Sequence, residues 1–200
     1  MYTSADSEAI FQYHRHMIDL HGNRGTAALG WRDPHSQTVR FLALSTMANL
    51  SGHSVLDAGC GHGDLCSYLL QLYTNINYRG VEQIPELLHE ASKRYQNQEG
   101  VSFIQADFME NTLPPADYVM ASGSLNYYHV DPEFIYKAIF QLYKHCSLGF
   151  GFNLLSHVIP NGLIVSYDAV QIMNYCSSLC SKVHLKNDYS DEDFTIFMYR

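Results

Sequence analysis

The sequence predicts an α/β fold of three layers, with one doubly wound sheet of seven strands that is mostly parallel and has an antiparallel last strand. Two observations support this prediction. From residue 51 onward, short apolar runs alternate with helical patterns, which is typical of parallel strands joined by right-handed crossovers. Near the carboxyl-terminal end, two extended runs are joined by residues 187–192 alone. This link is too short for a parallel crossover, so the last strand is expected to run antiparallel.

Two helices are expected before the sheet begins. Apolar residues recur near the helical period over residues 7–20. The second helix starts with Asp33 as N-cap and Pro34 at its first position, and it runs to about Asn49. We expect Gln37 and Arg40 on a side of this helix that neighbours its buried face. The residues expected to face the sheet are Val39, Leu42, Ala43, Met47 and Leu50.

The sheet and its crossover helices follow in order along the chain. The expected strands begin at Val55 and cover 77–83, 101–107, 117–123, 149–155, 183–186 and 194–198. The expected helices cover 64–72, 85–95, 132–145 and 169–180.

Size and composition favour one domain. A chain of 200 residues with 46% apolar content can bury its own core. We divide it into a helical lid over residues 1–50 and an α/β core over residues 51–200. A net charge of −8 with only 12 Lys and Arg residues argues against a nucleic-acid partner and favours a small molecule.

The location is expected to be cytoplasmic. Five cysteines are an odd number without regular disulfide spacing, which favours a reducing compartment. The amino terminus lacks the basic and apolar regions of a secretory signal, and no apolar run reaches membrane-spanning length. We expect no metal, because His14 with His16, and Cys176 with Cys180, supply too few ligands for a zinc site.

A glycine loop follows the first strand. Gly59, Gly61 and Gly63 separate Asp57 from the helix that begins at Asp64. Glycines let a ligand approach bare backbone, and the first turn of the helix offers unpaired N–H groups. The same glycines could serve only the sharp turn between strand and helix.

Two further strands end in acidic residues. Glu82 stands a little over 20 positions beyond the loop, where a βαβ unit brings the second strand beside the first. A carboxylate there can accept hydrogen bonds from both hydroxyls of a ribose. The third strand ends in Asp107, which Phe108 follows directly. The pattern predicts a site for a nucleotide-type ligand at this edge of the sheet.

These motifs resemble those of the class I S-adenosylmethionine-dependent methyltransferases over about residues 53–200. The resemblance implies S-adenosylmethionine as cofactor, with Glu82 on its ribose, Asp107 and Phe108 at its adenine, and Ala121 and Ser122 beside its methionine part. The cofactor-binding residues that we expect are Trp31, Arg40, Asp57, Gly59, Cys60, Gly61, Glu82, Gln83, Asp107, Phe108, Ala121 and Ser122.

Upstream and carboxyl-terminal segments are similar to a bacterial branch of this family. The segments are 21–22, 29–31, 37, 40–41, 152–156 and 194–200. We expect the helix that carries Arg40 to close over the cofactor, with Arg40 on the methionine carboxylate and the Trp31 ring against the cationic sulfur. The alternative is that Trp31 is a packing anchor and Arg40 a solvated charge.

The predicted function is methyl transfer from S-adenosylmethionine to a small-molecule acceptor, whose reacting atom stays open between oxygen, nitrogen, carbon and sulfur. A hydroxyl acceptor would need a base, for which Tyr127 and His129 are the candidates. One alternative is an NAD-dependent oxidoreductase, although Asp64 stands where the third glycine of Gly-x-Gly-x-x-Gly should be. Another is a non-catalytic module that binds S-adenosylmethionine.

Overall fold

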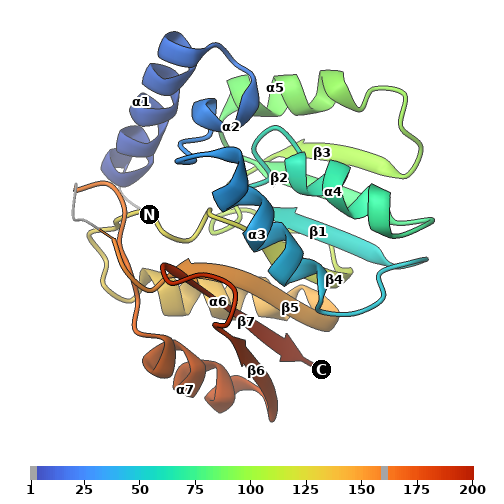
Figure 1. Ribbon diagram of the computed structural model, residues 1–200, viewed down its shortest axis with the longest axis vertical. Helices are drawn as coiled ribbons and strands as arrows, with labels where there is room; N and C mark the ends of the chain where they lie inside the picture. The colour runs from blue at the N-terminus through green and yellow to red at the C-terminus, as the bar shows by residue number, and fades with distance from the viewer. Residues whose placement is uncertain (1–3, 159–161) are drawn as a thin grey trace.

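The computed structural model describes residues 4–158 and 162–200, and it shows one central sheet between two layers of helices (Figure 1). Residues 1–3, which begin the segment that we judged to lack a secretory signal, lie outside the described residues, as do residues 159–161.

The sheet has seven strands in the order β3-β2-β1-β4-β5-β7-β6. Strand β7 runs antiparallel to both of its neighbours, and all other pairs are parallel. The strands are β1 (Ser54–Ala58), β2 (Asn77–Glu82), β3 (Val101–Gln105), β4 (Ala116–Ala121), β5 (Cys146–Leu155), β6 (Lys182–Lys186) and β7 (Asp193–Tyr199). The predicted fold class, including the reversed last strand, is confirmed.

Helices cover both faces of the sheet. One apolar cluster joins the strands to α3 and α4, and a second joins the opposite face to α6 and α7. The helices are α1 (Ser4–His21), α2 (Gly25–Ala28), α3 (Pro34–Ser45), α4 (Asp64–Leu72), α5 (Pro85–Arg94), α6 (Phe134–Lys144) and α7 (Ala169–Leu179). The short helix α2 was missed in the sequence.

Helix α3 begins as predicted, but it ends at Ser45 and not at about Asn49, and part of its predicted buried face is wrong. The Asp33 side chain accepts a hydrogen bond from the Ser36 N–H at 2.7 Å and caps the helix. Ala43, Met47 and Leu50 are buried as predicted, but Leu42 is 54% exposed. Phe41 and Leu44 are buried in its place. The buried face therefore follows positions 37, 41 and 44, which lie four and three residues apart on one side of a helix.

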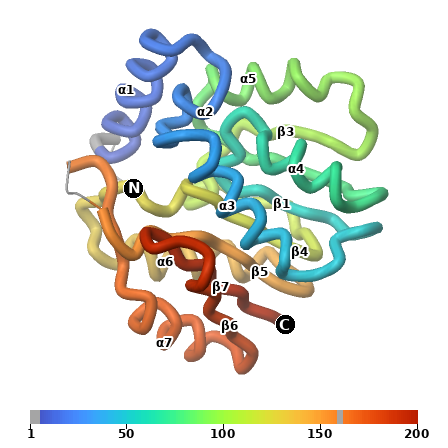
Figure 2. Tube along the Cα trace, in the orientation of Figure 1, coloured from blue at the N-terminus to red at the C-terminus, as the bar shows by residue number. Residues whose placement is uncertain are grey.

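Helix α1 lies outside the layered core, at the end of the sheet where β1, β2 and β4 finish (Figures 1 and 2). Its apolar contact is a small separate cluster of Ile10 with Ile84 and Leu87 of the α5 region. The tube in Figure 2 shows the segment after β4 beside the one after β5, and Tyr127 pairs with Ile164 in an antiparallel bridge.

Candidate active site

A cavity of about 570 Å³ opens at the carboxyl ends of β1, β2 and β4, where the strand order reverses. Such switch points are where doubly wound sheets bind ligands. Eleven of the twelve predicted cofactor residues line the cavity, and so do Tyr127 and His129. The exception is Ala121, whose side chain is buried in the apolar cluster under α6. The sequence neighbour Ser122 is the one that reaches the cavity, because successive strand residues point to opposite faces.

The glycine loop is shaped so that glycine is required. Gly59, Gly61 and Gly63 have φ angles of +80°, +54° and +74°. A Cβ atom at Gly59 would lie 2.3 Å from Cβ of Ser124, and one at Gly61 would lie 2.8 Å from the Leu29 side chain. Backbone at this loop therefore packs directly against the segments after β4 and α2.

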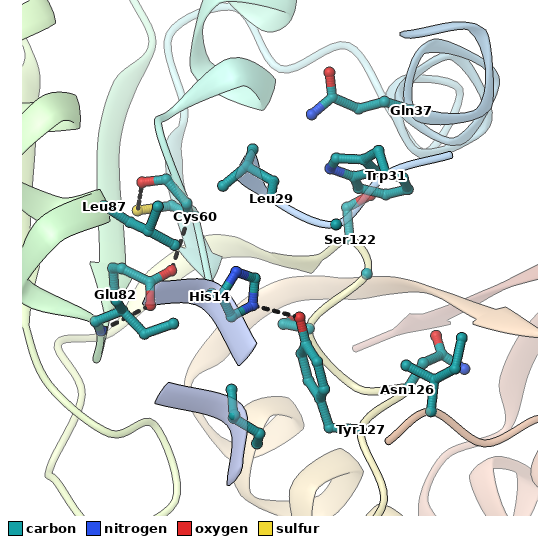
Figure 3. A pocket seen from close by; sticks show the side chains of 18 of the residues that line it. His14, Leu29, Trp31, Gln37, Cys60, Glu82, Leu87, Ser122, Asn126 and Tyr127 are labelled. Atoms are coloured by element: carbon teal, nitrogen blue, oxygen red, sulfur yellow. Dashed lines mark hydrogen bonds between the residues drawn. The ribbon is translucent and has the colours of Figure 1, made fainter. Parts of the chain in front are cut away.

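Glu82 fastens the glycine loop to β2. Its carboxylate is 6% exposed and accepts hydrogen bonds from the N–H of Gly61 and the N–H of Ile84, both at 2.9 Å (Figure 3). Burial raises the pKa of Glu82, and the backbone hydrogen bonds oppose that change. Each carboxylate oxygen can accept a second hydrogen bond, so Glu82 can hold the loop and a diol together.

Asp57 is a buried carboxyl at the end of β1. It accepts a hydrogen bond from the Tyr78 hydroxyl of the neighbouring strand. Burial raises the pKa of Asp57 to about 7, the Tyr78 bond lowers it, and the charge of Glu82 raises it further. A cation brought into the cavity beside Asp57 would offset the cost of burying its negative charge.

Asp107 forms a turn after β3. Its Oδ1 accepts from the Met109 N–H at 2.8 Å, and its own N–H donates to Oδ1 of Asn111 at 2.8 Å. Phe108 is partly buried and packs against the apolar cluster on the α6 side. Both residues line the cavity on the side opposite β4.

Arg40 and Trp31 form one unit at the α3 side of the cavity. The Arg40 Nε and Nη2 atoms lie 2.7 and 2.6 Å from Oδ1 of Asp193, at the start of β7. The guanidinium lies 4.6 Å from the centre of the Trp31 ring, and a Cβ at Gly123 would lie 3.0 Å from that ring. Arg40 is therefore not a solvated charge, and it already has a carboxylate partner.

Ser122 belongs to a chain of polar contacts beneath the cavity. Its hydroxyl donates to Oδ1 of Asn153 at 3.0 Å, and Nδ2 of Asn153 donates to Oγ1 of Thr195 at 2.6 Å. These hydrogen bonds link β4 to β5 and β7, and they fix the position of the end of β4.

The two base candidates lie in different surroundings. The His129 ring stacks on Phe134 at 3.4 Å, and Nδ1 of His129 is buried without a hydrogen-bond partner among the described residues. That atom lies 3.7 Å from the Asp6 carboxylate. The pKa of His129 is lowered by burial, and the Asp6 charge opposes this. The Tyr127 hydroxyl instead meets the imidazole of His14 at 2.6 Å (Figure 3).

His14 is the site residue that sequence reasoning missed, since we considered it only as a metal ligand. The sequence feature that could have identified His14 is its position in the apolar stripe of α1, where a polar residue stands four positions after Ile10. Residues 4–158 and 162–200 contain no group of three or more side chains placed to hold a metal ion. Over the same ranges, no helix has the length and apolar character needed to cross a membrane.

The sheet order and the glycine loop define an α/β protein with a cavity at the switch point of its sheet, which is where proteins of this class bind nucleotide-type ligands. A methyltransferase domain family matches residues 55–148. A Mycobacterium tuberculosis protein, Rv1506c, named as a candidate methyltransferase, is 29% identical over 155 residues, which cover 72% of this chain and 92% of that protein. The fatty-acid O-methyltransferase of Mycolicibacterium smegmatis is 28% identical over 78 residues, which are 39% of this chain and 28% of that enzyme.

Solved structures share the fold. One is magnesium protoporphyrin IX methyltransferase from Synechocystis PCC 6803, which was solved with bound S-adenosylhomocysteine. It superposes on this chain with a TM-score of 0.65 and 18% sequence identity, and the match covers 83% of this chain and 83% of that enzyme. The methyltransferase domain model, the Mycobacterium tuberculosis relative and the shared fold together support a class I S-adenosylmethionine-dependent methyltransferase.

Proposed function

We propose that this methyltransferase acts on a small-molecule acceptor and holds S-adenosylmethionine between the glycine loop, Glu82 and Asp107. The contact between Glu82 and the Gly61 N–H carries this proposal. It brings the acid of β2 and the loop after β1 to one point of the cavity, where a ribose can meet both.

The remaining cofactor groups have partners along the same wall. Asp107 and Phe108 would take the adenine, and Asp57 would take the ammonium group of the methionine part. Arg40 keeps N–H donors beyond those directed at Asp193, and these can reach a carboxylate. Trp31 would cover the sulfonium, since aromatic faces attract cations.

The cavity argues for a small acceptor. A volume of about 570 Å³ is in the range of small-molecule sites. The net charge of −8 argues against a nucleic acid. All five cysteines are free thiols, so we propose a cytoplasmic location. The sulfonium already activates the methyl group, so the protein's main task is to align the acceptor and exclude water, which can contribute roughly 7–11 kcal/mol.

Calorimetry with S-adenosylmethionine, S-adenosylhomocysteine and NAD tests the cofactor site. We expect both sulfur nucleotides to bind and NAD not to bind. Glu82→Ala should weaken binding of S-adenosylhomocysteine by about 2–3 kcal/mol, because it removes a charged hydrogen-bond acceptor. The exposed Glu8→Ala is the control. Binding of NAD alone would contradict the assignment.

Methyl transfer is tested with S-adenosylmethionine carrying a labelled methyl group. The acceptors are offered as pools of alcohols and phenols, carboxylic acids, amines and thiols. Labelled product from any pool supports the proposal. Label transferred only to nucleic acid would contradict it.

A further inference from the structure

The contact between His14 and Tyr127 joins α1 to the loop after β4, across 113 residues of sequence. Nε2 of His14 lies 2.6 Å from the Tyr127 hydroxyl, and both side chains line the cavity. Figure 3 shows the His14 ring between Glu82 and Tyr127, with its edge turned to the phenol. The pair thus stands beside the proposed cofactor site rather than in the apolar core.

The hydrogen-bond partners assign the tautomer of His14. Its Nδ1 lies 3.4 Å from the Ala28 carbonyl oxygen, which can only accept a hydrogen bond. Nδ1 therefore carries the proton and Nε2 carries the lone pair, so the Tyr127 hydroxyl donates to Nε2. The phenol oxygen keeps lone pairs of its own, which can accept a proton from a group in the cavity.

The surroundings keep both groups neutral at pH 7. Burial lowers the pKa of His14, the Ala28 bond raises it, and the charge of His62 in the glycine loop lowers it. Burial raises the pKa of Tyr127, and Tyr13 on α1 and Glu82 on β2 raise it further. Neutral His14 is then a free base beside a protonated phenol.

We propose that Tyr127 and His14 form a proton relay that accepts the proton of a hydroxyl or amino group on the acceptor during methyl transfer. The inference rests on the function proposed above and narrows the acceptor to molecules with an O–H or N–H group. Tyr127 is the catalytic residue, and His14 is the positioning residue that takes up the proton. The relay gives the role of base to this pair and not to His129.

The step balances in atoms and charge. The acceptor oxygen or nitrogen forms a bond to the methyl carbon, and the bond from that carbon to sulfur breaks with its electron pair left on sulfur. The acceptor proton passes to the Tyr127 oxygen while the phenol proton passes to Nε2 of His14. The positive charge of the sulfonium is thus replaced by one on the His14 imidazolium, which later releases its proton to water.

The relay is tested first without an acceptor, by NMR of the full chain with ¹⁵N-labelled histidine and saturating S-adenosylhomocysteine. The His14 signals are the ones lost in His14→Gln. At pH 8 we expect Nδ1 of His14 to carry a proton and Nε2 to carry none. We expect Nε2 to take up a proton at a pH below 6.5. Tyr127→Phe should shift the Nε2 signal of His14, whereas the control Tyr128→Phe, at a residue 50% exposed, should not.

A proton on Nε2 at pH 8, or His14 signals unchanged by Tyr127→Phe, would overturn the relay. Failure of the wild-type protein to bind S-adenosylhomocysteine would instead overturn the proposed function, so the two failures are distinguishable.

Turnover gives the second test, with the acceptor pool that yields labelled product. Tyr127→Phe should lower kcat about 100-fold or more, as loss of a general base does, with the Kd for S-adenosylhomocysteine within twofold of wild type. The wild-type kcat should fall as the pH drops below 6.5, and His14→Gln should lose this pH dependence. A kcat within threefold of wild type in Tyr127→Phe would overturn the relay.

Discussion

Asp57 lies in the cavity at a cost to the stability of the ligand-free protein. Its pKa is about 7 in the folded chain, against an ordinary value of 3.8. Between these pH values the unfolded chain releases the proton and the folded chain keeps it, so stability falls as the pH rises from about 4 to 7. The carboxylate is thus held ready for a cation at the expense of stability.

Asp57→Asn should therefore stabilise the ligand-free protein at pH 8 and change it little at pH 4. Asparagine can still accept from the Tyr78 hydroxyl without carrying a charge. A gain of about 2 kcal/mol would raise the melting temperature by roughly 4–8 °C. Thermal unfolding at both pH values measures this, with the exposed Asp19→Asn as control. An equal shift at pH 4 and pH 8 would show that charge is not the cause.

The glycine loop has no room for a Cβ atom at Gly59. Gly59 and Gly52 both have positive φ angles, +80° and +78°, but a Cβ at Gly52 meets nothing within 4 Å. Gly52→Ala should cost only the left-handed backbone strain, about 1–2 kcal/mol. Gly59→Ala adds the clash with Ser124, so it should lose more stability and all measurable binding of S-adenosylhomocysteine. Denaturant unfolding and calorimetry compare the pair, and equal effects would contradict the close approach.

Among the elements, α3 is tied to β7 by a nearly buried ion pair. The side chains of Arg40 and Asp193 are only 12% and 4% exposed. Arg40→Ala leaves the Asp193 carboxylate without its cation, which should cost about 3–5 kcal/mol. Adding Asp193→Asn should recover part of this loss. Urea unfolding measures both, and the exposed Arg32, bridged to Glu192, provides the control Arg32→Ala, whose midpoint should match wild type.

The same Arg40→Ala variant separates the two roles of the arginine. Weaker binding of S-adenosylhomocysteine with unchanged binding of adenosine, which has no carboxylate, would support a contact with the cofactor. Equal losses for both ligands would assign Arg40 to the fold alone.

The sequence correctly predicted those helices and strands whose limits depend on residues close to them in the chain. The Asp33 cap and the helix at 64–72 were placed to the residue, because an N-cap and a glycine loop act on their own neighbours. The face of α3 was wrong at Leu42, because the choice between adjacent helix faces depends on the sheet beneath. The Arg40–Asp193 and His14–Tyr127 contacts join residues 153 and 113 apart, and no local pattern reports such a pairing.

At the scale of the whole molecule, α1 stands apart from the core and closes the cavity with Ile10 and His14. It is attached by a small apolar cluster, by the exposed ion pair of Arg15 with Glu86, and by polar contacts of Asp6 and His14 with the segment after β4. Residues 1–50 were predicted to form a lid, but α3 packs on the sheet. We propose that only the part before α3 acts as a lid over the α/β core.

A lid of this kind should show in hydrogen exchange. Amides of α1 should exchange faster than those of β1 and β4 in the ligand-free protein, since few buried contacts hold the helix. S-adenosylhomocysteine should slow α1 exchange and leave α7, on the far side of the sheet, unchanged. Mass spectrometry of the exchanged protein measures both helices. Protection of α1 equal to that of β4 without ligand would contradict a mobile lid.

The place of β7 in the sheet has a consequence for how the protein is made. This strand lies between β5 and β6, yet it follows both in the chain. During synthesis β6 has no hydrogen-bonding partner, and the edge of β5 stays open, until residues 193–199 have emerged. The apolar residues Phe150, Phe152 and Leu154 then belong to an unpaired edge, which is the kind of surface that aggregates. The nascent chain is thus most exposed to misassembly just before its final strand arrives.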